Sequence, residues 1–157
     1  MRISGLISLS LFLSLSLSLN LPLLLGACAR PPVLRPFTSD GCSLFPDRDR
    51  VSGESWCGCC LEHDYAYWRG GSEAERDSAD RALGDCVEKR TGDAYLAKAV
   101  YRGTQRGGAG GMPTWYRWGY GWPRRTIAPI TDSLRRIAVA EKGGYDRPEM
   151  LKTVCGE

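Results

Sequence analysis

The chain has 157 residues and a formal net charge of +3 at pH 7. This length corresponds to one domain, and so small a net charge gives no basis for nucleic-acid binding. Seven cysteines and nineteen glycines indicate a domain rich in loops, whose stability must come from more than a large apolar core.

The first 27 residues have the features of an export signal. Arg2 supplies a positive charge, residues 3–25 form an apolar run rich in Leu and Ser, and small residues precede Cys28. This pattern is typical of a bacterial lipoprotein signal peptide, in which Cys28 is acylated and becomes the first residue of the mature protein. The alternative is an uncleaved membrane anchor, because the run is long enough to span a bilayer.

We therefore expect an exported protein that is either lipid-anchored in the cell envelope or secreted, with a phospholipid membrane surface as its partner. Ala29 is not the acidic residue of an inner-membrane retention signal, which favours the outer membrane where the organism has one. Residues 28–37, with three prolines, are expected to form an extended tether. Residues 38–157 are expected to form the folded domain.

The six cysteines that remain after Cys28 predict three disulfides in an exported domain. Each disulfide would stabilise the fold by about 2–4 kcal/mol. A metal site is the competing interpretation, because Cys57, Cys59, Cys60 and His63 offer thiolates and an imidazole close together. Adjacent cysteines point in different directions on a helix, so Cys59 and Cys60 suit two separate bridges better than one tetrahedral ion.

Two consecutive helices are expected at the centre of the domain, after a loop over residues 38–55. The first covers about residues 57–68 and is followed by Gly70-Gly71, a C-cap signal. The second begins after Ser72, which forms a capping box with Glu75, and continues to about Arg90. The domain is therefore predicted to be mainly α-helical and disulfide-stapled, with long loops.

The chain beyond residue 92 predicts weaker elements. A short helix is expected over residues 93–101, followed by a flexible glycine-rich segment over residues 103–113. Aromatic residues then alternate with Arg and Gly over residues 116–122, which predicts a small extended or β segment with one aromatic face. These aromatics either pack in the core or seat the protein at a lipid surface. Thr131 or Asp132 begins a predicted final helix.

His63 is the only histidine of the chain, and two carboxylates lie near it in the predicted helices. A histidine takes a proton from water best when a carboxylate fixes its tautomer through the other ring nitrogen. Asp80, at the border of the apolar stripe of the second helix, is the expected partner. Asp64 points to another side of the helix and is suited to hold a hard cation such as Ca²⁺. A structural histidine that packs between helices is the alternative.

The segment Cys59-Cys60-Leu61-Glu62-His63-Asp64-Tyr65-Ala66-Tyr67 resembles the secreted phospholipase A2 signature Cys-Cys-x-x-His-Asp-x-x-Tyr. A second signature of that family is an Asp followed six residues later by a Cys in the next helix, and it resembles Asp80 and Cys86. The resemblance covers about residues 40–86. It implies a pair of antiparallel helices, with His63 as general base, Asp80 as its orienting acid, Tyr67 as a hydrogen-bond donor to Asp80, and Asp64 as a Ca²⁺ ligand.

The resemblance also implies the disulfides Cys59–Cys86 and Cys42–Cys60, which leaves Cys57 and Cys155 as the last pair. Two departures from the family accompany it. Ala66 and Ala79 replace a pair of cysteines that family members usually join, and the usual glycine-rich calcium loop is absent. The carbonyls of Gly41 and Ser43, in the segment that stands in its place, are the expected loop ligands.

The implied activity is calcium-dependent hydrolysis of the sn-2 ester of glycerophospholipids by a water molecule that His63 activates. Two other functions remain open from the sequence. One is a non-catalytic envelope lipoprotein on the same fold that binds lipid or a protein partner. The other is a zinc or thiol-redox module built on the cysteine cluster and His63.

Overall fold

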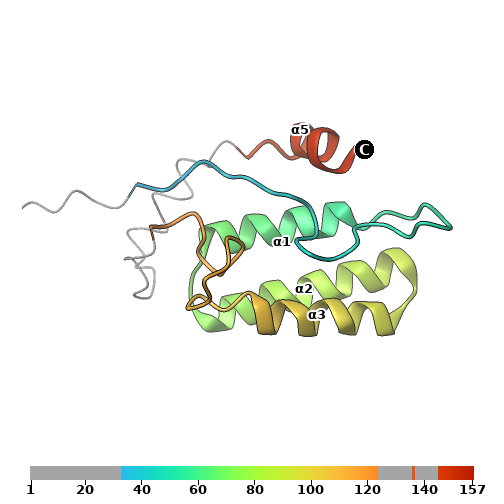
Figure 1. Cartoon of the computed structure of the whole chain (residues 1–157), viewed down its shortest axis with the longest axis horizontal. Helices are drawn as coiled ribbons and strands as arrows, with labels where there is room; N and C mark the ends of the chain where they lie inside the picture. Colours follow the sequence, from blue (N-terminus) through green and yellow to red (C-terminus); the bar gives the residue numbers. More distant parts are fainter. Residues whose placement is uncertain (1–32, 124–135, 137–144) are drawn as a thin grey trace, which may run out of the picture. The chain divides into compact units, whose positions relative to one another are not determined.

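The computed structural model describes residues 33–123, 136 and 145–157 (Figure 1). This part of the chain is mainly helical, and its β pairing is limited to one isolated bridge between Arg48 and Ser55. Within these ranges, no helix is long and apolar enough to cross a membrane. The predicted signal peptide, the predicted acylation site at Cys28 and most of the predicted final helix lie outside the described residues.

Three helices follow one another directly: α1 (Cys57–Arg69), α2 (Glu73–Thr91) and α3 (Ala94–Gly107). Their ends follow from local sequence. Ser72 and Glu75 form the predicted capping box, and Gly92 ends α2 in the left-handed conformation. Helix α2 packs against both α1 and α3, and each helix runs antiparallel to the one before it (Figure 1).

Helix α3 is longer than the sequence predicted, because residues 103–107 of the segment expected to be flexible are helical. Its glycines serve close packing here. A Cβ atom added to Gly107 would lie 3.4 Å from the ring of Tyr116, and one added to Gly108 would lie 2.5 Å from the ring of Tyr67. The Gly107 contact is an ordinary one, whereas at Gly108 only glycine leaves room for the ring of Tyr67.

The prediction of an extended aromatic segment was wrong, since residues 110–122 form successive turns. Gly119 has a φ of +71° and reverses the chain direction. The amides of Gly119 and Gly121 donate to the carbonyls of Tyr67 and Trp68, at 2.7 and 3.1 Å. The turns therefore satisfy carbonyl groups that the end of α1 leaves without helical partners.

Two tryptophans of these turns belong to the core. Trp118 and Trp122 are 7% and 2% exposed, and their indole nitrogens donate to the carbonyls of Gly71 and Arg69. Trp115, in contrast, is 62% exposed. The packing interpretation therefore holds for the two buried tryptophans and does not extend to Trp115.

The structure contains the three disulfides Cys42–Cys60, Cys57–Cys155 and Cys59–Cys86. They are the pairs that the sequence led us to expect, and Cys59 and Cys60 do have different partners. Cys57–Cys155 joins the start of α1 to η3 (Leu151–Cys155), one turn of π-helix that follows α5 (Arg147–Met150). All six of these cysteines are paired, so none of them offers a thiolate ligand to a zinc ion.

Helix α1 is held by apolar clusters on two sides. Leu61 and Trp68 pack with residues of the N-terminal segment and with Trp122, while Cys59 and Cys60 pack with residues of α2 and α3, including Leu83. Because both faces are buried, α1 cannot rotate without disrupting a cluster. The direction of its His63 side chain is therefore fixed by packing.

Candidate active site

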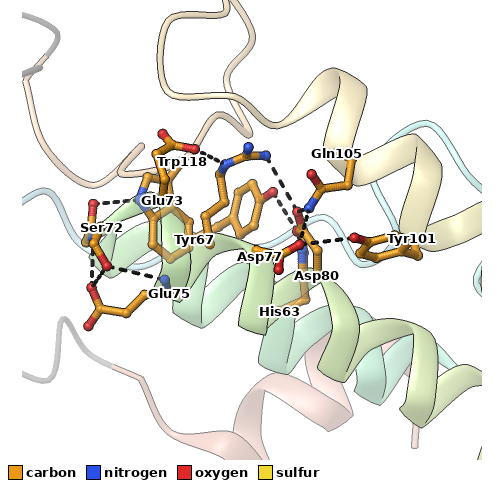
Figure 2. Close-up of polar contacts among 12 residues, drawn as sticks. His63, Tyr67, Ser72, Glu73, Glu75, Asp77, Asp80, Tyr101, Gln105 and Trp118 are labelled. Carbon is orange, nitrogen blue, oxygen red and sulfur yellow. Dashed lines mark hydrogen bonds and ion pairs between the residues drawn. The ribbon is translucent and has the colours of Figure 1, made fainter.

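His63 of α1 and Asp80 of α2 form the centre of the site (Figure 2). Nε2 of His63 lies 2.8 Å from Oδ1 of Asp80. Asp80 is completely buried, and the His63 residue is 9% exposed. The sequence predicted this contact, and the antiparallel packing of the two helices brings the residues together.

Asp80 accepts further hydrogen bonds at both of its oxygens. The hydroxyl of Tyr67 donates to Oδ1 over 2.6 Å, and Nε2 of Gln105 donates to Oδ2 over 2.6 Å (Figure 2). Nη1 of Arg76 lies 3.6 Å from Oδ2, as an ion pair one helical turn before Asp80. A buried carboxylate requires such partners, and they hold Asp80 in one orientation toward His63.

Two of these partners, Gln105 and Arg76, were missed by the sequence analysis. Gln105 lies on α3, one turn after Tyr101. The side chains of Tyr101 and Gln105 both donate a hydrogen bond to Oδ1 of Asp77 (Figure 2). The spacing of Tyr101 and Gln105 on one helix face was the available signal. It had no predictive value while the helix was expected to end at Tyr101.

Tyr67 is a hydrogen-bond donor at all physiological pH values. Burial raises the pKa of its hydroxyl above the ordinary range, and the hydrogen bond to the Asp80 carboxylate raises it further. Its ring also lies 4.1 Å from that of His63, centroid to centroid. Tyr67 therefore supports both the imidazole and the carboxylate that orients it.

The hydrogen bond to Asp80 also decides which nitrogen of His63 is left for chemistry. A neutral imidazole has one N–H donor and one acceptor, and a proton on Nε2 satisfies the Asp80 carboxylate. Nδ1 is then the acceptor, and it is the nitrogen that remains for a water molecule. His63 is therefore arranged as a base with a fixed tautomer.

His63 lines a cavity of about 200 Å³. The polar side of this cavity includes Asp64 and Tyr67, and its wall along α3 consists of small or apolar residues. Gly103 is one of them, and a Cβ atom added to it would contact nothing within 4 Å. Leu44, which is 79% exposed, and Phe45 also line the cavity from the loop before α1. The chamber beside His63 is thus suited to an apolar chain.

Asp64 lines the same cavity and is 7% exposed. The pKa of Asp64 is raised to about 8, mainly by burial. The hydroxyl of Ser39, which donates to Oδ2 over 2.6 Å, lowers this pKa, and the nearby carboxylate of Asp40 raises it. An ionised Asp64 is therefore unfavourable without a positive charge beside it. A buried carboxylate in this condition fits a bound cation, which would restore its ionised form.

Gly41 and Ser43, the loop residues expected to bind Ca²⁺ together with Asp64, are only partly suited to this role. The carbonyl of Gly41 already accepts from the amide of Ser43 at 3.1 Å. Ser43 lines the cavity beside Asp64, and its hydroxyl donates to Asp40 over 2.6 Å. In the described ranges no group of three or more His, Cys, Asp or Glu side chains is placed to hold a metal ion. A cation at Asp64 would therefore need oxygen ligands from the backbone and from water, as Ca²⁺ commonly uses.

No protein-family model matches this chain, and no curated protein or solved structure matches it.

Proposed function

We propose that this protein is a calcium-dependent, phospholipase A2-like hydrolase that cleaves the sn-2 ester of glycerophospholipids. The observation that carries the proposal is the position of His63, which lines an apolar cavity next to Asp64 and is bonded through Nε2 to a fully buried carboxylate. The antiparallel helices α1 and α2, joined by Cys59–Cys86, support the phospholipase A2-like fold. The resemblance in sequence and this geometry point to the same residues.

In the proposed reaction, Nδ1 of His63 takes a proton from a water molecule as the water oxygen attacks the sn-2 carbonyl carbon. Asp80 stabilises the resulting imidazolium through Nε2–H and does not itself need to be protonated. The tetrahedral intermediate then loses the glycerol oxygen, which receives the proton from Nδ1. The products are a free fatty acid and a lysophospholipid, and His63 returns to its starting state.

Asp64 is the residue that would hold Ca²⁺, together with oxygen ligands of the loop that contains Gly41 and Ser43. A bound Ca²⁺ at this place would supply positive charge for the substrate phosphate and for the ester oxygen. The elevated pKa of Asp64, about 8 without the ion, supports a role that needs a cation partner. The Asp64 carboxylate contributes to the reaction only when it is ionised.

We further propose that the protein is exported and anchored to a membrane through an acylated Cys28. The leader and the short proline-containing tether support this location. A domain tethered to a bilayer would meet phospholipid without first having to bind a membrane from solution. The apolar side chains of Leu44 and Phe45, which line the His63 cavity, are suited to face such a surface.

The test is fatty-acid release from mixed micelles of phospholipid and detergent, measured with Ca²⁺ and with chelator. We expect release with Ca²⁺ only. His63→Gln should lower the rate by at least about a hundredfold, the usual contribution of a general base. Equal release from wild type and His63→Gln, both with intact disulfides, would remove the catalytic role of His63.

A non-catalytic lipid-binding lipoprotein is a second candidate, favoured by the absence of the usual glycine-rich calcium loop from the segment before α1. Calorimetric titration with Ca²⁺ separates the two. Heat that depends on Asp64 supports the enzyme. Lipid binding without a heat of Ca²⁺ binding, and without hydrolysis, supports the second candidate.

A further inference from the structure

A second cavity, of about 570 Å³, adjoins the cavity of His63. Asp64, Ser43 and Tyr116 line both of them, whereas His63 and Tyr67 line only the first. A ligand group held at Asp64 therefore lies at the boundary between two chambers. The first cavity contains His63 and has apolar walls, whereas the second is lined by charged and aromatic residues.

The second cavity carries two carboxylates, those of Asp40 and Asp64. Oδ1 of Asp40 accepts from the hydroxyl of Ser43, and Oδ2 of Asp64 accepts from that of Ser39. Within the described part of the chain, neither carboxylate forms an ion pair with an arginine or lysine. Asp40 is exposed and Asp64 is buried, so the accessible carboxylate of this cavity is that of Asp40.

Two arginines, Arg35 and Arg117, also line this cavity, and they differ in exposure. Arg117 is 6% exposed, and its guanidinium donates to the backbone carbonyls of Trp118, Gly119 and Trp122. Its charge thus serves the turns that close the end of α1. The side chain of Arg35 is exposed.

Aromatic rings form another part of the lining. The rings of Trp115 and Tyr116 lie 5.1 Å apart, centroid to centroid, with an angle of 84° between their planes. The two rings thus pack edge to face, and both line the cavity. Tyr120 also lines the cavity, and it lies close enough to Asp64 and Asp40 for both to raise the pKa of its hydroxyl, after the larger effect of burial.

Aromatic faces beside a carboxylate are the chemistry that recognises quaternary ammonium groups, through cation–π attraction. We propose that the second cavity binds the trimethylammonium group of a choline headgroup, with Asp40 as its counter-charge and Trp115 and Tyr116 as its aromatic walls. This rests on the proposed function and adds the headgroup to it. Because Asp64 lines both cavities, a phospholipid whose phosphate met the Ca²⁺ proposed at Asp64 would have its ester on the side of His63 and its headgroup on the side of the second cavity.

The first arm of the test measures binding without hydrolysis. Tetramethylammonium is titrated into the full chain with chelator present, and binding is followed by NMR shifts, with tert-butanol as a neutral probe of similar shape. We expect saturable binding of the cation and none of the alcohol. Asp40→Asn and Trp115→Ala should each lower the affinity for tetramethylammonium by about tenfold, within the range of such contacts. Asp85→Asn and Tyr95→Ala, exposed residues outside the cavity, should bind as wild type does.

The second arm compares kcat/KM for phosphatidylcholine with that for phosphatidylglycerol at saturating Ca²⁺. The ratio should fall by about tenfold in Asp40→Asn and in Trp115→Ala, and should keep its wild-type value in the two control variants. The proposal is overturned if the cation does not bind, or if both probes bind alike. It is also overturned if Asp40→Asn lowers Ca²⁺ affinity and both hydrolysis rates equally, since Asp40 would then be a metal ligand.

The two arms separate this inference from the proposed function. Binding of tetramethylammonium that depends on Asp40 and Trp115, in a protein that hydrolyses no phospholipid, supports the cation site and contradicts the enzyme. Hydrolysis that depends on His63, with an unchanged headgroup ratio in both cavity variants, supports the enzyme and contradicts the cation site.

Discussion

The imidazole of His63 and the carboxylate of Asp80 are joined by a hydrogen bond of 2.8 Å between two different helices. Packing on both faces of α1 sets the direction of His63, while Tyr67 and Gln105 hold the two oxygens of Asp80. The contact is therefore fixed from both sides before any substrate binds. Such preorganisation is what the proposed role of His63 as a general base requires.

The tautomer of His63 can be measured directly, because the chain has only one histidine and its NMR spectrum contains one imidazole. We expect the neutral ring to carry its proton on Nε2, since that nitrogen faces the Asp80 carboxylate. Long-range ¹H–¹⁵N correlation spectra at high pH test this. A ring protonated on Nδ1, or a mixture of both forms, would contradict the proposed orientation.

Tyr67→Phe should reduce the free energy of unfolding by about 1–3 kcal/mol, because it removes a donor from a buried carboxylate. Urea unfolding measures the effect. Tyr95→Phe is the matched control, since Tyr95 is 89% exposed and its variant should unfold as wild type does. A Tyr67→Phe protein as stable as the control would show that Asp80 does not depend on this hydroxyl.

Two glycines of the same region should respond in opposite ways to alanine. Gly103→Ala should stabilise the protein by about 0.5–1 kcal/mol, because alanine favours the helix and its Cβ meets open space. Gly108→Ala should destabilise it, because the new Cβ would lie 2.5 Å from the ring of Tyr67. Thermal unfolding of the two variants compares them. Equal shifts in the same direction would contradict the close packing described for α3.

Local signals in the sequence predicted α1 and α2 well, because their ends are set by glycines and by the Ser72–Glu75 box. They predicted the His63–Asp80 contact for the same reason, since helix faces follow from residue spacing. The end of α3 could not be predicted, because Gly107 and Gly108 look like breakers until Tyr116 and Tyr67 are seen to pack on them. Gln105 was missed as a consequence.

The aromatic turns were mispredicted for another reason. An alternation of aromatic residues has the period of a strand, yet no neighbouring strand exists in the described part of the chain to pair with it. The segment pairs with the carbonyls at the end of α1 instead. Partners of this kind lie about fifty residues away and leave no local pattern: Trp118 and Gly71 are 47 residues apart.

The stability of the calcium-free protein should depend on pH through Asp64. Burial raises the pKa of this residue to about 8 in the folded protein, and its value in the unfolded chain is about 4. The folded state therefore keeps a proton that the unfolded state has lost between these values. The free energy of unfolding should fall as the pH rises from about 4 to about 8, by at most about 1.4 kcal/mol per pH unit from this group.

Urea unfolding in chelator at several pH values tests this, with Asp64→Asn for comparison. The variant should lose this part of the pH dependence, whereas Asp85→Asn, exposed on α2, should retain it. Addition of Ca²⁺ should restore stability to the wild type at pH 8 and not to Asp64→Asn. Identical pH profiles for wild type and Asp64→Asn would show that Asp64 is not the buried acid described here.

The most direct test of the central claim is the rate of sn-2 fatty-acid release at saturating Ca²⁺ by wild type and by His63→Gln. Circular dichroism and the non-reduced mass should first show the same fold and three disulfides in both proteins. We expect release by the wild type and a rate at least about a hundredfold lower in the variant. Equal rates, or no release by a wild-type protein that binds Ca²⁺, would contradict it.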